Sequence, residues 1–259
     1  MKFRFSVFIA TAALCVAACV DYGAAGEAEG ESSELTAIRV NPGNPNNPYD
    51  ALGQLHNDAM DYIFARVDRN STNETIDQLT DEYFASIDVN VRVSELTHRP
   101  EMAAYIEGFA SADDDAAFLR AHGYRARAIS YYNAIRANMR RPRLEGAISH
   151  MRDTEDQILN DRSINDRERL SLLVSAAISR YSMVWVSTHL PGLPLDSICS
   201  EDVKGGLSGA LGRAITGALT GTVTLPVIGT VAGWLGGGII GGIGGAVTQS
   251  AYAALSNWW

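Results

Sequence analysis

Apolar residues recur at intervals of three and four positions along the middle of the chain, from about residue 48 to residue 190. This spacing puts one apolar face on an α-helix, which completes a turn about every 3.6 residues. Only residues 89–93 alternate as a strand would, and that run is short. The pattern therefore predicts an all-α fold with a bundle of about six helices. The six apolar stripes span residues 52–67, 76–87, 102–109, 124–139, 144–158 and 170–185.

Residues typical of helix ends lie beside several of these stripes. Ser71 with Glu74, and Asn165 with Glu168, have the spacing of a capping box, in which two side chains satisfy free backbone amides at a helix start. The stretch at 191–194 contains two prolines and a glycine, which end the sixth stripe. Because the stripes carry their own start and stop signals, we expect the central helices to fold without the C-terminal part of the chain.

The C-terminal part of the chain contains glycine at nearly every fourth position. No charged side chain follows Arg213, a stretch of 46 residues. Glycine costs a helix in water about 1 kcal/mol relative to alanine, so the repeat is favourable only where helices pack closely. Leu225-Pro226 interrupts the repeat, which predicts a Gly-rich helical hairpin over residues 205–259. The expected helix-packing seam consists of Gly229, Gly233, Gly237, Gly241 and Gly245.

Two environments would suit such a hairpin. Residues 227–247 number 21, close to the about 20 residues that a helix needs to cross the hydrocarbon core of a bilayer. In the alternative, the hairpin stays in water and the central bundle covers it. The glycine spacing leaves both open.

The N-terminus has the pattern of a bacterial export signal. Two basic residues precede an apolar run at 5–18, which is too short to span a bilayer and has the length of a signal-peptide core. The run ends in Val16-Ala17-Ala18-Cys19, which resembles the lipobox of bacterial lipoproteins. The resemblance implies that residues 1–18 are removed and that Cys19 carries lipid. An ordinary signal peptide cleaved nearby is the alternative.

The residues after this motif are small, acidic and rich in proline and asparagine. Such a composition cannot bury a core, so residues 19–47 are expected to form a disordered tether. The stretch from Asn47 to Ile63 resembles the start of uncharacterised lipoproteins of the Bacteroidota, a family that implies an envelope location and no particular activity. The expected segments are a signal peptide at 1–18, the tether at 19–47, a helical domain at 48–190, a linker at 191–204 and the glycine-zipper hairpin at 205–259.

Composition and charge exclude several functional classes. The formal net charge is -9, which argues against nucleic acid as a partner because phosphate needs a basic surface. Three cysteines are present, and lipidation of Cys19 after removal of the leader would leave Cys199 alone, so no intrachain disulfide is expected. The cysteines form no CxxC pair and the five histidines are scattered, so no metal site is expected.

Three groups of polar residues are candidates for chemistry, and each has a plainer structural explanation. His56, Asn57, Asp58 and Asp61 are the densest polar group on one helix, but His56 lacks a ligand at the fourth following position, so a buried or capping role is expected. The acids at 113–115 lack the calcium-loop pattern and suit a helix N-terminus. The charged run at 152–169 is typical of a solvated helix face. We find no motif of a catalytic site, so neither enzymatic activity nor a cofactor is expected.

The glycine repeat resembles glycine-zipper segments of bacterial envelope lipoproteins, and it is also similar to the Gly-rich hydrophobic domains of secreted bacteriocins. The first resemblance implies a non-enzymatic lipoprotein anchored in the cell envelope. Its hairpin would insert into membrane lipid or form a homo-oligomer through the glycine repeat. The second implies an alternative, a secreted antibacterial effector that forms pores. In some bacteria an aspartate directly after the lipidated cysteine retains a lipoprotein at the inner membrane. Here Val20 follows Cys19 and Asp21 comes second, so the sequence does not distinguish the inner membrane from the outer.

Overall fold

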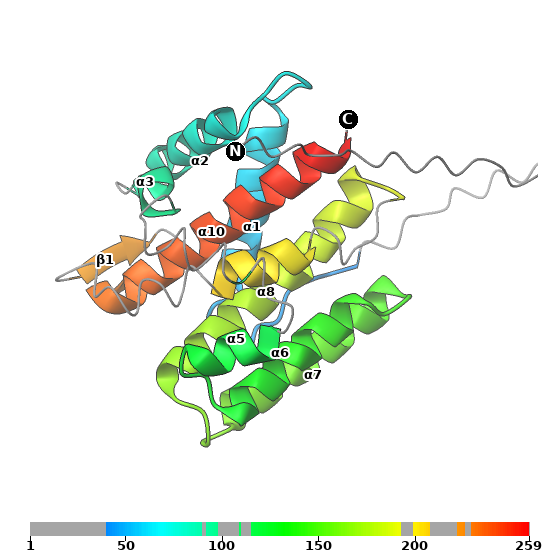
Figure 1. The fold of residues 1–259 in the computed structure, drawn as a ribbon, viewed down its shortest axis with the longest axis vertical. Helices are drawn as coiled ribbons and strands as arrows, with labels where there is room; N and C mark the ends of the chain where they lie inside the picture. Colours follow the sequence, from blue (N-terminus) through cyan, green and yellow to red (C-terminus); the bar gives the residue numbers. More distant parts are fainter. Residues whose placement is uncertain are drawn as a thin grey trace, which may run out of the picture. The chain divides into compact units, whose positions relative to one another are not determined.

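The amphipathic stripes form helices in the computed structural model, which describes residues 40–89, 92–97, 109, 115–192, 199–207, 222–225 and 229–258. The prediction of an all-α fold is confirmed, apart from one short β-hairpin. The third predicted stripe lies outside the described residues except for Phe109, which is buried. The helices are α1 Ala51–Phe64, α2 Asn73–Ser86, α3 Val93–Thr97, α5 Asp115–Ala121, α6 Ala126–Met139, α7 Leu144–Asn160, α8 Asp166–His189 and α10 Gly233–Trp258 (Figure 1).

One of the two predicted capping boxes forms. At the start of α8 the Asn165 side chain accepts a hydrogen bond from the Glu168 amide, and the Glu168 carboxylate accepts one from the Asn165 amide, each at 2.8 Å. The box predicted at Ser71 is wrong, because α2 is capped one residue later by Thr72. The Ser71 hydroxyl instead accepts a hydrogen bond from the Asp68 amide and closes the preceding turn.

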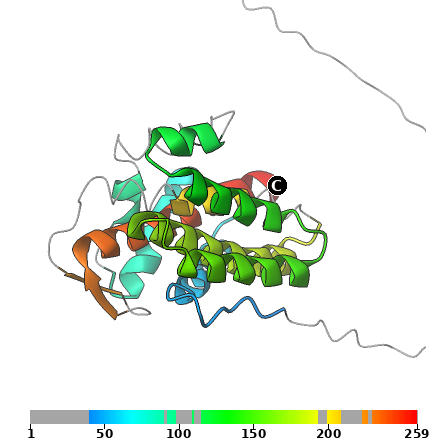
Figure 2. The ribbon, with the colours of Figure 1, turned by 90° about the horizontal axis from the view of Figure 1, so that it is seen from below.

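Helices α6, α7 and α8 each pack against the other two, and α1 packs along α8 (Figure 2). Gly53 of α1 allows α1 and α8 to approach closely. A Cβ atom at this position would lie 2.7 Å from the carbonyl oxygen of Ala177 and 2.2 Å from the ring of Tyr181. The absence of a side chain therefore brings the backbones of α1 and α8 nearer than any larger residue would allow.

Helix α10 lies inside the bundle. It runs between α2 and α3 on one side and α8 on the other, and it also contacts α1 (Figure 1). Residues 236–248 are buried without exception. Its isoleucines belong to the same hydrophobic core as the central helices. The expected boundary between a domain at 48–190 and a separate hairpin is therefore wrong, because the two parts share one core.

The expected linker at 191–204 is wrong for its last residues. Residues 199–207 are helical, and Cys199, Val203 and Leu207 are fully buried. They lie at the spacing of one helix face, which joins the core that α8 and α10 share. Residues 48–190 by themselves would therefore leave part of this shared core uncovered.

The predicted helical hairpin around Pro226 is replaced by two strands. β1 (Thr222–Leu225) pairs antiparallel with β2 (Gly229–Ala232), and Val223 faces Val231 in the register. β-branched residues favour the strand over the helix here. The turn is where the sequence predicts it, but the regular structure on both sides of it differs. The second helix begins only at Gly233.

Among the described residues one helix, α8, is long and apolar enough to cross a membrane. In the bundle, 83% of its apolar stretch is buried. Helices at the centre of a protein core have the same length and composition, so this property alone does not indicate a membrane span.

Candidate functional site

The glycine seam predicted from the sequence is only partly helical. Gly229 is the first residue of β2, is exposed, and has a φ of 83°, a conformation that favours glycine. Its assignment to a helix-packing seam is therefore wrong. Gly233 begins α10, while Gly237 and Gly241 are buried within it. Cys19, the predicted lipidation site, lies outside the described residues.

Gly245 makes the close helix contact that the glycine repeat predicts, and its neighbour is Gly205 of the same chain. A Cβ atom on Gly245 would lie 2.8 Å from the Gly205 carbonyl oxygen, and one on Gly205 would lie 2.6 Å from the Gly245 carbonyl oxygen. Both residues belong to the four-residue register, so the two arms of the repeat meet backbone to backbone. At this point the seam is a contact within the chain.

Gly244 makes a second close contact that the four-residue register did not identify. A Cβ atom there would lie 2.2 Å from a methyl group of Val93 in α3. The two adjacent glycines at 244 and 245 thus face two neighbours, α3 and the helical residues 199–207. The adjacent glycines in the sequence could have indicated this second contact, because neighbouring positions on a helix point in different directions.

Buried polar groups lie on the elements that meet at this seam. His56 of α1 and Asp202 of residues 199–207 approach to 3.0 Å between Nε2 and Oδ1, and both side chains are essentially inaccessible. The approach lacks hydrogen-bond alignment, and neither carboxylate oxygen of Asp202 has a hydrogen-bond partner among the described residues. The hydroxyls of Ser175, Thr248 and Ser250 are buried without a partner in this part of the chain as well.

Such groups cost free energy when they are removed from water, about 1–3 kcal/mol each for a neutral hydroxyl and more for a charge. The elements that pack α10 therefore combine good apolar packing with an unfavourable polar contribution. This combination favours a helix that is held in place but is less stably bound than its apolar burial alone would indicate.

The polar group on α1 does not form one site. His56 faces Asp202, whereas the Asn57 amide donates to the Tyr181 carbonyl oxygen at 2.9 Å. Asp61 accepts a hydrogen bond from the Trp185 indole at 2.5 Å. No group of three or more His, Cys, Asp or Glu side chains within the described ranges is arranged to hold a metal ion. The residues instead connect α1 to α8 and to residues 199–207.

Part of the predicted tether is bound to the bundle. Asn44 and Asn47 are buried, and both side-chain amides donate to the Glu155 carboxylate, at 2.6 Å and 2.8 Å. Arg180, which is also fully buried, donates to Glu155 at 3.0 Å and to Asp50 at 2.6 Å. The expectation of disorder up to residue 47 is therefore wrong for residues 40–47. The asparagines that suggested a linker donate hydrogen bonds to a buried carboxylate.

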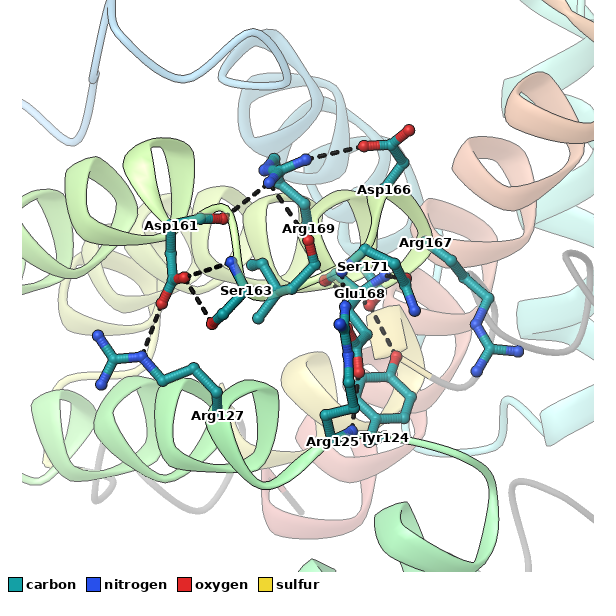
Figure 3. A network of polar contacts seen from close by, with 12 residues as sticks. Tyr124, Arg125, Arg127, Asp161, Ser163, Asp166, Arg167, Glu168, Arg169 and Ser171 are labelled. Carbon is teal, nitrogen blue, oxygen red and sulfur yellow. Dashed lines mark hydrogen bonds and ion pairs between the residues drawn. The ribbon is translucent and has the colours of Figure 1, made fainter.

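A second network joins the start of α6 to the start of α8 (Figure 3). Glu168 has no exposed side-chain surface, and it accepts hydrogen bonds from the backbone amide of Arg125 at 2.8 Å and from its guanidinium at 2.6 Å. Beside this pair the hydroxyls of Tyr124 and Ser171 lie 2.7 Å apart. The prediction that the run at 152–169 is a solvated face is wrong for Glu155 and Glu168.

The buried Glu168 should make stability depend on pH. Burial raises the pKa of Glu168, but hydrogen bonds from the side chain and backbone of Arg125 and from the backbone of Asn165 outweigh it, so the pKa lies below its ordinary value. A carboxyl whose pKa is lowered by folding adds stability above its unfolded pKa, about 4.3, and loses it as the pH falls. We expect the Tm of the wild type to fall more steeply than that of Glu168→Gln between about pH 5 and about pH 3. Thermal melts followed by circular dichroism measure both slopes, and parallel slopes would contradict this role.

A scan against protein-family models, a search of curated proteins and a search of solved structures each found no match to this chain.

Proposed function

We propose that the protein is a non-enzymatic lipoprotein of the bacterial cell envelope, whose glycine-rich C-terminal helix inserts into a membrane or oligomerises there. The observation that carries the proposal is the burial of α10, a helix of 26 residues without a charged side chain, at the centre of a water-compatible bundle. Lipid on Cys19 would hold that bundle close to the membrane surface. The helix is longer than the about 20 residues needed to span the hydrocarbon core, and its glycines make its most apolar stretch less apolar than that of α8.

The contacts of α10 support the idea of a stored helix. In the bundle, close packing at Gly205 and Gly245 compensates for the poor helix preference of glycine. In a bilayer the same small residues would let α10 approach another helix, including that of a second copy. The buried hydroxyls of Thr248 and Ser250, which lack hydrogen-bond partners among the described residues, lower the free energy needed to open the bundle.

A disulfide that ties α10 to α3 should block membrane activity. A Cβ atom on Gly244 would lie 3.3 Å from the Cβ of Val93, close to the about 3.5–4.5 Å of a disulfide. We expect Val93→Cys/Gly244→Cys, in a mature chain that keeps lipidated Cys19 and carries Cys199→Ser, to release dye from lipid vesicles only after reduction. Reduced protein can free the helix, whereas the oxidised protein cannot.

The matched control is Val93→Ser/Gly244→Ser, which has side chains of similar size and cannot be cross-linked. Its dye release should be the same with and without reductant. Equal release by the oxidised and reduced cysteine variant would mean that α10 does not leave the bundle. No release by any form, together with no binding to the vesicles, would contradict the membrane function itself.

The second candidate is a secreted antibacterial effector that forms pores. It is favoured by the same complete burial of residues 236–248, because a pore-forming helix must be covered while the protein crosses water. Expression in the periplasm separates the two candidates. The effector should be toxic there, and the disulfide-locked variant should not be, whereas a resident envelope lipoprotein should be tolerated in both forms.

A further inference from the structure

A cleft of about 290 Å³ opens where α1 and α8 end. Its walls combine one carboxylate with three ring systems and two aliphatic side chains, and none of these lining residues is a lysine or an arginine. A cavity of this volume matches a small organic molecule rather than a large substrate. The lining residues are Asp61, Phe64, Ala65, Trp185, His189 and Leu190.

The carboxylate of Asp61 is oriented toward a particular side. The Trp185 indole donates to its Oδ1 atom at 2.5 Å, and Trp185 itself is only 3% exposed, so the donor is held by the core. The His189 Nε2 atom lies 3.6 Å from the same Oδ1 atom, whereas Oδ2 accepts no hydrogen bond from the described part of the chain, and 55% of the Asp61 side chain is accessible. Asp61 therefore presents a negative charge to the solvent at the cleft from a fixed anchor.

The rings form a connected aromatic wall beside this charge. Phe64 meets Trp185 edge-on with 4.9 Å between ring centroids, and His189 stacks on Trp185 at 4.6 Å. The His189 Nδ1–H donates to the Trp185 carbonyl oxygen at 2.9 Å, which sets the orientation of the imidazole. Aromatic faces attract organic cations, most strongly where a neighbouring carboxylate adds to the field.

The ends of two helices add to the negative potential of the cleft. α1 ends at Phe64 and α8 ends at His189, so the cleft lies at two helix C-termini. Each C-terminus carries a partial negative charge from carbonyl groups that point along the helix axis. Arg66, two residues beyond the end of α1, stacks on the Tyr62 ring at 3.6 Å and donates to the Tyr62 carbonyl oxygen. Its guanidinium is thus engaged outside the set of lining residues.

We propose that this cleft binds a small organic ammonium ion, with Asp61 as its counter-charge, with Phe64 and His189 as its accessible aromatic wall and with the nearly buried Trp185 holding both in place. A methylated ammonium fits best, because its diffuse charge loses little hydration and its methyl groups pack against rings. The ammonium can belong to a free amine such as choline or to the headgroup of a membrane lipid. This binding is independent of whether α10 leaves the bundle.

Binding of choline to the full-length protein tests the proposal directly. Isothermal titration calorimetry at pH 8 should give a dissociation constant on the order of 1 mM. The neutral isostere 3,3-dimethylbutanol has the same shape without the charge, and it should bind at least about tenfold more weakly. Equal binding of the two compounds, or no binding of choline, would overturn the proposal.

The variant Asp61→Asn removes the charge and keeps an oxygen that can accept the Trp185 hydrogen bond. We expect it to keep the wild-type Tm, to bind choline about tenfold more weakly and to bind dimethylbutanol as the wild type does. The matched control is Asp58→Asn, which changes an exposed carboxylate on α1 whose oxygen accepts a hydrogen bond from Gln54. If both variants bind choline equally well, Asp61 is not the counter-charge.

Vesicles distinguish the two sources of the ammonium. If the ligand is a lipid headgroup, phosphatidylcholine vesicles should bind the wild type better than phosphatidylglycerol vesicles, and free choline should compete. If the ligand is a free amine, choline should bind while the vesicles show no such preference. Choline binding by the disulfide-locked variant should remain normal, which separates this site from the membrane function of α10.

Discussion

Replacing Arg180 by methionine should destabilise the protein by about 3–5 kcal/mol, the range found when one partner of a buried ion pair is removed. Arg180 and Glu155 both have side chains without any accessible surface, and they are 3.0 Å apart. In the variant the Glu155 carboxylate would stay buried with only the amides of Asn44 and Asn47 as partners. Urea unfolding monitored by circular dichroism measures the loss.

The double variant Arg180→Met/Glu155→Gln is the matched control for this prediction. Its new side-chain amide would still offer an oxygen to the asparagine amides without placing an unpaired charge in the core, so we expect it to recover much of the lost stability. A double variant as unstable as the single one would assign the loss to packing of the arginine side chain. A single variant within about 1 kcal/mol of the wild type would mean that the pair contributes little.

The second large effect concerns the glycine contact between α10 and residues 199–207. Gly245→Ala should destabilise the protein by about 2 kcal/mol, although alanine is the better helix former by about 1 kcal/mol. The added Cβ would lie 2.8 Å from the Gly205 carbonyl oxygen, and backbone atoms cannot move aside as a flexible side chain can. Urea unfolding gives the change in the free energy of unfolding.

Gly146→Ala is the same chemical change in an open position. Gly146 lies in α7, and a Cβ atom there would meet nothing within 4 Å. We expect this variant to gain up to about 1 kcal/mol from helix preference alone. Opposite signs for the two substitutions would identify the close backbone approach as the cause. A stabilising Gly245→Ala would contradict the packing of α10 in the bundle.

The local sequence was sufficient to predict the helices of the described bundle. Their apolar stripes coincide with α1, α2, α6, α7 and α8, because a helix buries one face and the spacing of that face is visible in any window of the chain. The capping box of Asn165 and Glu168 was predictable for the same reason, since its two residues are three positions apart. The close approach of glycine backbones was also visible in the repeat.

The tertiary structure alone decided which polar residues are buried. Glu155 belongs to a charged run that is typical of a surface. Its hydrogen-bond and ion-pair partners, Asn44, Asn47 and Arg180, come from distant parts of the chain. His56 likewise meets Asp202 only after α1 and residues 199–207 have packed together. No local spacing contains these pairs, because they depend on the arrangement of whole helices.

For a related reason, the sequence did not determine whether lipid or protein covers α10. A charge-free helix with a glycine face can be covered by lipid or by protein, and both satisfy its backbone and its apolar side chains. Its actual neighbours in the bundle, Val93 and Gly205, fit their surfaces to Gly244 and Gly245. The strands beside Pro226 are similar, since Thr222–Leu225 becomes a strand by pairing with Gly229–Ala232. Spacing along the chain determined which segments have faces to bury, whereas shape complementarity between distant segments determined what covers them.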